Sequence, residues 1–243
     1  NKAGGGSVTG LQFAGLFNTN KGKSDIQAAG LFNVGQDVRI AQMAAFMNIA
    51  HKVSGVQIGL INVADSVGGA SIGLLNIIRH GYNHLDLSYD NAITGNVGLR
   101  LGSRHFYNIF QGGARWENSF FPKFKTENDP FTHWTFGYGI GTAITLGTRS
   151  TMNLEVVANH VNEGMHFTKD LNLLNQFRLI VDRKLFGGVR IFGGATFNLM
   201  VSKYYDPDTG QLGSTIVPYT WENYSTGSAD IRSWLGFTAG LRF

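Results

Sequence analysis

Residues 228–243 read SADIRSWLGFTAGLRF, a stretch that alternates between two kinds of side chain up to the terminal Phe243. Counted back from Phe243, one face carries Leu241, Ala239, Phe237, Leu235, Ser233 and Ile231. The opposite face carries Arg242, Gly240, Thr238, Gly236, Trp234, Arg232 and Asp230. Because successive side chains of a strand point to opposite sides of a sheet, this stretch predicts a β-strand with one mainly apolar face and one polar, glycine-rich face.

The same two-residue alternation occurs upstream, in 97–101, 134–146, 177–182 and 189–201. In 134–146 one face is aromatic and aliphatic, and the other is almost entirely Gly, Ala and Thr. A soluble antiparallel sheet also alternates, but it would have to expose these glycine-rich and charged faces to water with few Lys or Glu to solubilise them. We therefore predict a closed transmembrane barrel, whose apolar face meets lipid and whose closure leaves no sheet edge.

The composition agrees with a barrel and excludes several other classes. Charged residues make up 15% of the 243 residues, whereas about a quarter is usual in soluble domains. Mean hydropathy is −0.05, and no run approaches the roughly 20 apolar residues of a membrane-spanning helix. The chain has no cysteine, which excludes disulfides and thiolate sites, and its scattered basic residues argue against a nucleic-acid partner. No signal peptide is visible, so the numbering is expected to start at or after a processing site.

The N-terminal third of the chain is built from repeats. The segments LQFAGLFN (11–18), IQAAGLFN (26–33) and AQMAAFMN (41–48) recur with a period of 15, and VQIGLIN (56–62) and ASIGLLN (70–76) continue them with one residue fewer. Such a unit suits either one rung of a β-solenoid with stacked asparagines or one strand of a barrel wall. The repeats have one apolar face and one face mixed with amides, which favours the barrel wall, although a solenoid interior can be built from the same residues.

The expected fold class is therefore all-β, a single transmembrane antiparallel barrel over 1–243, with repeat-containing strands in 1–90 and non-repeat strands in 91–243. Because single-chain bacterial barrels usually have an even number of strands, we expect about 14 (12–16), with 211–222 as the extra candidate although Pro218 argues against it. The alternative is a β-solenoid followed by a smaller barrel. The thirteen candidate strands are 9–18, 25–34, 39–49, 54–64, 69–79, 83–89, 93–102, 105–116, 132–147, 150–161, 172–183, 187–203 and 228–243.

The polar faces of these strands supply the candidate functional residues. Since arginines outnumber acids among them, they suit a weakly anion-selective constriction. Pairing that simply fills the lumen is the favoured interpretation, because arginines and amides opposite carboxylates satisfy a polar interior. We identify no catalytic constellation, cofactor motif or metal-ligand set, and expect no enzymatic activity. The candidate lumen charges are Arg100, Arg115, Glu155, Arg178, Asp182, Arg190, Asp230, Arg232 and Arg242.

The closing strand resembles that of bacterial outer-membrane proteins, in which a terminal aromatic residue is part of the signal read by the barrel-assembly machinery. The resemblance implies that role for Phe243, with Leu241 and Phe237 on the same face. In addition, GVQIGLIN, GGASIGLLN and RHGYNHLDLS resemble the short surface-repeat proteins of Bacteroidota and spirochaetes over roughly residues 8–90. The third repeat departs from that motif, with Ala44-Ala45-Phe46 in place of Gly-Leu. The family carries no assigned enzymatic activity, so the resemblance implies a location more than a mechanism.

The expected function is that of an integral outer-membrane barrel acting as a structural or partner-binding component of the cell envelope, including as a subunit of a larger complex. The expected partners are outer-membrane lipid, the barrel-assembly machinery during biogenesis, and other outer-membrane proteins. Two alternatives are a small-solute pore with a weak anion preference and a surface adhesin.

Overall fold

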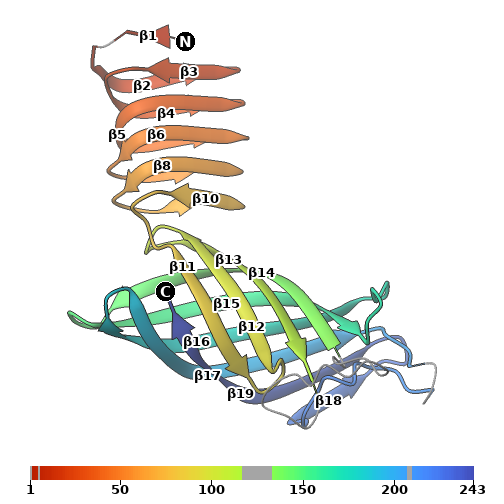
Figure 1. Ribbon diagram of the computed structural model, residues 1–243. Helices are drawn as coiled ribbons and strands as arrows, with labels where there is room; N and C mark the ends of the chain where they lie inside the picture. The colour runs from red at the N-terminus through yellow and green to blue at the C-terminus, as the bar shows by residue number, and fades with distance from the viewer. Residues whose placement is uncertain (1, 5, 117–132, 207–209) are drawn as a thin grey trace. The chain divides into compact units, whose positions relative to one another are not determined.

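The computed structural model of the protein describes residues 2–4, 6–116, 133–206 and 210–243. The described part is all-β (Figure 1). No helix within it is long and apolar enough to cross a membrane.

The chain divides into two compact units. The first comprises Asn1–His84, Arg100–Asn108 and Gly141–Ala143, and the second Leu85–Leu99, Ile109–Ile140 and Ile144–Phe243.

The N-terminal strands stack in parallel as successive rungs of a β-solenoid (Figure 1). Two rows of paired strands run through the stack, β2-β4-β5-β7-β9 and β3-β5-β6-β8-β10, and the long strand β5 belongs to both. The bounds are β1 (Lys2–Ala3), β2 (Val8–Ala14), β3 (Phe17–Asn20), β4 (Lys23–Ala29), β5 (Phe32–Ala44), β6 (Met47–Val53), β7 (Val56–Ile58), β8 (Ile61–Val67), β9 (Ser71–Ile72) and β10 (Leu75–Ile78).

The prediction that the repeats are barrel strands is wrong, and the alternative of a solenoid followed by a smaller barrel agrees with the structure. Equivalent residues of successive repeats pair with one another, for example Gln27 with Gln42 and Asn33 with Asn48. An antiparallel wall would reverse each repeat against its neighbour, so equivalent residues would not lie side by side along the whole segment. One repeat is therefore one full turn of the solenoid, not one crossing of a wall.

Two ladders of side-chain amides form the centre of the solenoid. In the glutamine ladder each amide donates a hydrogen bond to the glutamine of the preceding rung, as from Gln42 Nε2 to Gln27 Oε1 at 2.9 Å. In the asparagine ladder each amide donates to the asparagine of the following rung, as from Asn48 Nδ2 to Asn62 Oδ1 at 2.9 Å. Its members are Asn18, Asn33, Asn48, Asn62 and Asn76, all fully buried. Since the two ladders run in opposite directions, their amide dipoles oppose one another.

The asparagine ladder also forms hydrogen bonds with backbone carbonyl groups. The Nδ2 atoms of the first four members each donate a second hydrogen bond to a carbonyl oxygen ten residues further on, as from Asn48 to Ile58 O at 2.8 Å and from Asn62 to Ile72 O at 2.9 Å. This carbonyl belongs to the strand before the next asparagine. The amide therefore joins two rows of strands as well as two rungs, which explains why the residue recurs at this position.

The later rungs are one residue shorter because their corner is tighter. Where the third repeat turns through Ala44-Ala45-Phe46, the next turns through Gly59-Leu60. A Cβ atom on Gly59 would lie 2.6 Å from Asn48 Nδ2, and one on Gly73 would lie 2.1 Å from Gly59 O. The shorter rung therefore requires glycine at this corner.

Large apolar side chains cover the outside of the solenoid at these corners. One column of them, which we call the corner ridge, consists of Leu16, Leu31, Phe46, Leu60 and Leu74, each between 44 and 61% exposed. A small apolar cluster of Val38, Ala50, Val53, Ala64 and Ile78 is buried elsewhere in the unit. The solenoid thus has amides inside and apolar residues outside over much of its surface.

The C-terminal strands form an antiparallel sheet that closes on itself. Within the described residues, eight strands in the order β11-β12-β13-β14-β15-β16-β17-β19 make up the barrel, and β11 pairs with β19 to close it, with Leu87 opposite Leu241. The bounds are β11 (His84–Asp90), β12 (Gly95–Gly102), β13 (Tyr107–Arg115), β14 (His133–Thr145), β15 (Ser150–Glu163), β16 (Asn172–Phe186), β17 (Val189–Ser202) and β19 (Asp230–Arg242).

The expected number of about 14 strands is therefore wrong, because the barrel has eight. All eight were marked in the sequence to within three residues, and the excess came from counting the repeats. The segment 211–222 is not a barrel strand either. It leads into the short strand β18 (Glu222–Ser225), which pairs with the start of β19, Asp230–Ser233.

The predicted faces of the barrel strands are confirmed. In β16, Phe177, Leu179 and Val181 are 45 to 50% exposed, whereas the alternate residues Arg178 and Asp182 are buried. The outward apolar residues of the barrel, which we call the outer belt, include Leu87, Tyr89, Val97, Leu99, Phe110, Phe136, Ile140, Leu154, Val156, Phe177, Leu179, Val181, Ile191, Leu235, Phe237 and Leu241.

Replacing one amide of the solenoid ladder is expected to loosen the neighbouring rungs. In Asn48→Ala, Asn33 loses its acceptor and Asn62 loses its donor, and each unsatisfied buried group costs about 1–3 kcal/mol. Hydrogen–deuterium exchange of the full chain is expected to show reduced protection in 32–62. Lys52→Ala, an exposed change in the same strand, serves as the control. Equal protection in both variants would contradict the ladder's structural role.

Candidate functional site

The interior of the barrel holds most of the candidate residues. An eight-stranded barrel is just wide enough for its own side chains to fill, so every inward residue contacts other inward residues. Inward glycines on β14 provide some of the room. A Cβ atom on Gly137 would lie 2.2 Å from Asn159 Oδ1, and one on Gly139 would lie 2.7 Å from a methyl group of Val157.

Arg242, the last residue of the closing strand, is the centre of one charged network. Its guanidinium donates to both oxygens of Asp86, at 2.9 and 3.0 Å, and to Asp182 Oδ2 at 2.8 Å. Glu155 lies 3.9 Å away, and the Phe192 ring packs against the guanidinium at 5.2 Å. The side chains of Arg242, Asp182 and Glu155 have no exposed surface. The arginine therefore ties β19 to β11 and β16 from inside.

Asp182 connects this network to neighbouring strands. Its carboxylate accepts hydrogen bonds from Arg190 and from Asn153 Nδ2, the latter at 2.8 Å. Arg190 also donates to Thr151 Oγ1 at 3.0 Å. Two guanidinium groups thus share one fully buried carboxylate.

A second network surrounds Arg178. Its guanidinium donates to Gln111 Oε1 at 2.8 Å and to Gln176 Oε1, and it lies 4.0 Å from Asp90. Gln176 Nε2 in turn donates to Asp90 Oδ2 and to Asn198 Oδ1, both at 2.9 Å. Side-chain amides here link the charged groups, so the hydrogen bonds continue from strand to strand across the interior.

A buried apolar cluster includes residues of the same strands as these networks, with Leu174 on β16 and Met200 on β17. Ile216, from the segment that follows β17, packs with inward residues of the barrel and is fully buried. Arg115 fixes the segment by donating to Ile216 O. The cluster comprises Ala92, Ile93, Val161, Leu174, Met200, Ile216 and Trp234, with Val217 packed against it.

A polar cluster at the end of β15 anchors the same segment. Glu163 accepts hydrogen bonds from Ser214, from Thr215 Oγ1 at 2.8 Å and from Asn172 Nδ2 at 2.9 Å, and its Oε2 lies 2.8 Å from His133 Nε2. Glu163 lies beyond the outer belt of its strand, which includes Leu154 and Val156. Burial alone would raise the pKa of Glu163, but the hydrogen bond and charge of His133, with hydrogen bonds from Ser214 and Asn172, lower it to about 2.

This cluster has the residue types of a catalytic triad but not the geometry. In a triad the nucleophile contacts one imidazole nitrogen and the acid orients the ring through the other. Here Thr215 Oγ1 and Glu163 Oε2 lie 2.7 and 2.8 Å from the same nitrogen, His133 Nε2. The arrangement suits a polar clasp that attaches the 214–217 segment to the barrel.

The predicted lumen charges fall into three groups. Glu155, Arg178, Asp182, Arg190 and Arg242 belong to the two networks. Arg232 pairs with Asp230 at 2.7 Å near the start of β19. Arg115 holds the apolar cluster, and Arg100 points inward from β12 with 2% exposure.

The sequence interpretation missed Asp86, Asp90 and the clasp of Glu163 with His133. Asp86 and Asp90 lie in HLDLSYD (84–90), where Leu85, Leu87 and Tyr89 point outward, so the alternation was a usable signal. The clasp had no such signal, because its partners are 30 to 82 residues apart.

Within the described ranges, no group of three or more acidic and histidine side chains is placed to hold a metal ion. The networks instead pair buried arginines with buried carboxylates and amides. Chemically, the interior is suited to holding the barrel strands together.

Removing Arg242 is expected to destabilise the barrel strongly. Arg242→Met removes the guanidinium that pairs with buried Asp86 and leaves Asp182 with Arg190 alone, and breaking a buried pair in this way costs about 3–5 kcal/mol. Chemical unfolding of detergent-solubilised protein, followed by tryptophan fluorescence, measures the loss. Arg39→Met is the control, since Arg39 pairs with Asp25 but is 58% exposed, and exposed pairs contribute about 0–1 kcal/mol. Equal losses would contradict the role assigned to Arg242.

The clasp is expected to open in acid. Because the folded pKa of Glu163 is depressed to about 2 from the usual 4.5 of a free glutamate, its stabilising contribution is complete above pH 4.5 and is lost as the pH falls towards 2. Amide exchange in 213–217, measured between pH 5 and 2, is expected to rise steeply in the wild type. Glu163→Gln, which removes the titrating group, is expected to flatten this change, and an identical pH dependence in both proteins would contradict the assignment.

Comparisons with known proteins give no match, so a functional proposal rests on the fold and on the interior of the barrel. No protein-family model, no curated protein and no solved structure matches this chain.

Proposed function

We propose that the protein is an integral outer-membrane component of the bacterial cell envelope, in which the barrel is the membrane anchor and the solenoid binds partners. One observation carries the first half of this proposal. The closed barrel has an apolar exterior and an interior of paired charges and amides, which is the arrangement expected of a barrel surrounded by lipid.

The outer belt supports membrane insertion. Its residues are 37 to 53% exposed and occur on strand after strand, whereas monomeric soluble proteins rarely expose apolar patches of more than a few hundred Å². Closure of the sheet through β11 and β19 satisfies the backbone groups that an open edge would leave in hydrocarbon. Exposed aromatic residues, Tyr219, Trp221 and Tyr224, lie in β18 and just before it, as expected of an aromatic girdle at a membrane interface.

The filled interior favours an anchor over a pore. The two charged networks occupy the inward faces of strands around the barrel, and the apolar cluster with Ile216 occupies the space beyond them. A solute pathway would require several buried ion pairs to separate, each at a cost of several kcal/mol.

The solenoid supports the partner-binding half of the proposal. Its corner ridge and neighbouring apolar rows are exposed, for example Phe13 at 63% and Leu16 at 61%. Extended solenoid surfaces commonly bind other macromolecules. The proposed partners are other outer-membrane proteins, which present apolar surfaces of their own.

A surface adhesin is the second candidate. It is favoured by the finding that the repeats form a solenoid of their own instead of adding strands to the barrel. Binding of the purified protein only to isolated bacterial envelopes would favour the envelope component. Binding to the surfaces of other cells would favour the adhesin.

Insertion is tested with one substitution made at two depths. Leu179→Arg places a charge at the middle of the outer belt, where arginine costs about 2–4 kcal/mol in a membrane barrel, whereas Leu185→Arg places it at the end of β16, where the cost falls to about 0–1 kcal/mol. Folding into phospholipid vesicles, monitored by heat-modifiable migration, is expected to fail or weaken only for Leu179→Arg. Equal folding of both variants, or wild-type protein that does not insert, would overturn the proposal.

The anchor function is tested separately by conductance. Wild-type protein in planar bilayers is expected to give no stable channels, because the interior is filled. Clear and lasting openings would instead support the pore with a weak anion preference.

A further inference from the structure

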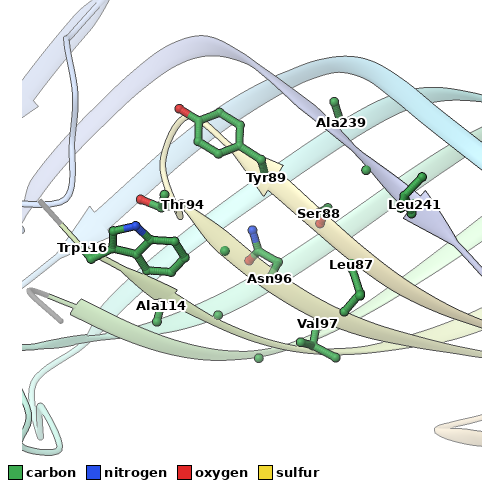
Figure 2. Close-up of a pocket in the computed structure, with 14 residues that line it drawn as sticks. Leu87, Ser88, Tyr89, Thr94, Asn96, Val97, Ala114, Trp116, Ala239 and Leu241 are labelled. Atoms are coloured by element: carbon green, nitrogen blue, oxygen red, sulfur yellow. The ribbon is translucent and has the colours of Figure 1, made fainter. Parts of the chain in front are cut away.

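A groove of about 800 Å³ crosses the outer wall of the barrel over β19, β11, β12 and β13 (Figure 2). It lies among outer-belt residues and opens to the outside. Of the lining residues that the structure describes, none carries a charge.

The groove exists because four outward positions have small residues. Gly95, Gly112, Ala114 and Ala239 line it where neighbouring strands present bulky side chains. These four residues come from three strands, so the hollow is a feature of the folded wall and not of any one segment.

Trp116 forms one wall of the groove and depends on Gly95. A Cβ atom on Gly95 would lie 2.5 Å from Cη2 of the Trp116 indole, so no larger residue fits beneath the ring as it stands. The glycine therefore lets the indole lie flat against β12.

The groove differs between its two ends. Figure 2 shows Trp116, Thr94 and Tyr89 towards one end, and Leu87, Val97 and Leu241 towards the other. Trp and Tyr have an apolar ring with one polar group, and both concentrate where hydrocarbon meets the head groups of a bilayer. The opposite end offers only aliphatic contacts.

We propose that this groove binds one acyl chain of a membrane lipid, with the chain along Leu87, Val97 and Leu241 and the head group beside Trp116, Tyr89 and Thr94. The inference rests on the proposed membrane location of the barrel. A peptide is a poor fit, because the strands beneath the groove are paired with one another and offer no free edge for an added strand. The described lining residues carry no charge that would favour a polar ligand, whereas a hydrocarbon chain needs only apolar contacts.

Gly112→Leu tests the proposal by filling the groove. A Cβ atom at Gly112 meets nothing closer than Thr135 O at 3.9 Å, so the larger residue does not clash with the wall. Ala158→Leu is the matched control, an outward and exposed position on β15, across the barrel from the groove. Each protein is reconstituted in vesicles of phosphatidylethanolamine and phosphatidylglycerol, extracted in mild detergent, and analysed by native mass spectrometry.

The wild type and Ala158→Leu are expected to retain one lipid, and Gly112→Leu is expected to retain about tenfold less, since losing contact with about two methylene groups has that effect. The added mass tells a diacyl phospholipid from a free fatty acid, and either supports the acyl-chain site. Equal retention by Gly112→Leu, or no retention by the wild type, would overturn it.

Heat-modifiable migration in the same vesicles separates the two proposals. If all three proteins insert and retain lipid equally, only the groove assignment fails. If the wild type does not insert, the membrane location fails first.

Discussion

Buried amides and charges in this protein must find hydrogen-bond partners inside it, and much of the structure follows from that requirement. An unsatisfied buried polar group costs about 1–3 kcal/mol, and a buried charge without its partner costs more. The solenoid meets the requirement by stacking identical amides, as between Asn33 and Asn48 at 3.0 Å. The barrel meets it by joining unlike groups across strands, as between Arg242 and Asp86. In both units many large apolar side chains lie on the outside, in contrast to the usual distribution in a soluble protein, and each unit buries only a small apolar cluster.

The same requirement explains what the sequence predicted and what it did not. Two-residue alternation in the C-terminal part was identified in five of the eight barrel strands, because an inward polar and outward apolar face is a local property of each strand. In the repeats, one apolar face and one face with amides favoured a barrel wall, although the same residues also build the interior of a solenoid. The signal that separates them was present in the constant spacing of Gln12, Gln27, Gln42 and Gln57, since identical amides bond along a ladder only when the strands are parallel and in register.

The interior was predictable in kind but not in detail. That Arg178 and Asp182 point inward follows from the alternation of β16. Which carboxylate meets which arginine does not, because closure brings together residues as far apart as Asp86 and Arg242, 156 positions along the chain. Closure also depends on the register of β11 against β19, which a single sequence does not specify. The clasp of Glu163 was less accessible still, since two of its partners, Ser214 and Thr215, come from a segment outside the regular strands.

A filled interior changes where recognition can take place. The charged groups that a porin-like protein would offer to solutes are here paired with one another, so their hydrogen-bonding groups are occupied. What is left is the exterior, where specificity comes from shape and from the few polar groups placed among apolar ones. Small residues at outward positions, such as Gly95 and Gly112, matter for this reason. A glycine or alanine at an outward position leaves a hollow in an apolar wall, and this hollow can bind an apolar ligand. On a polar surface, a binding site is made instead by adding a charged group.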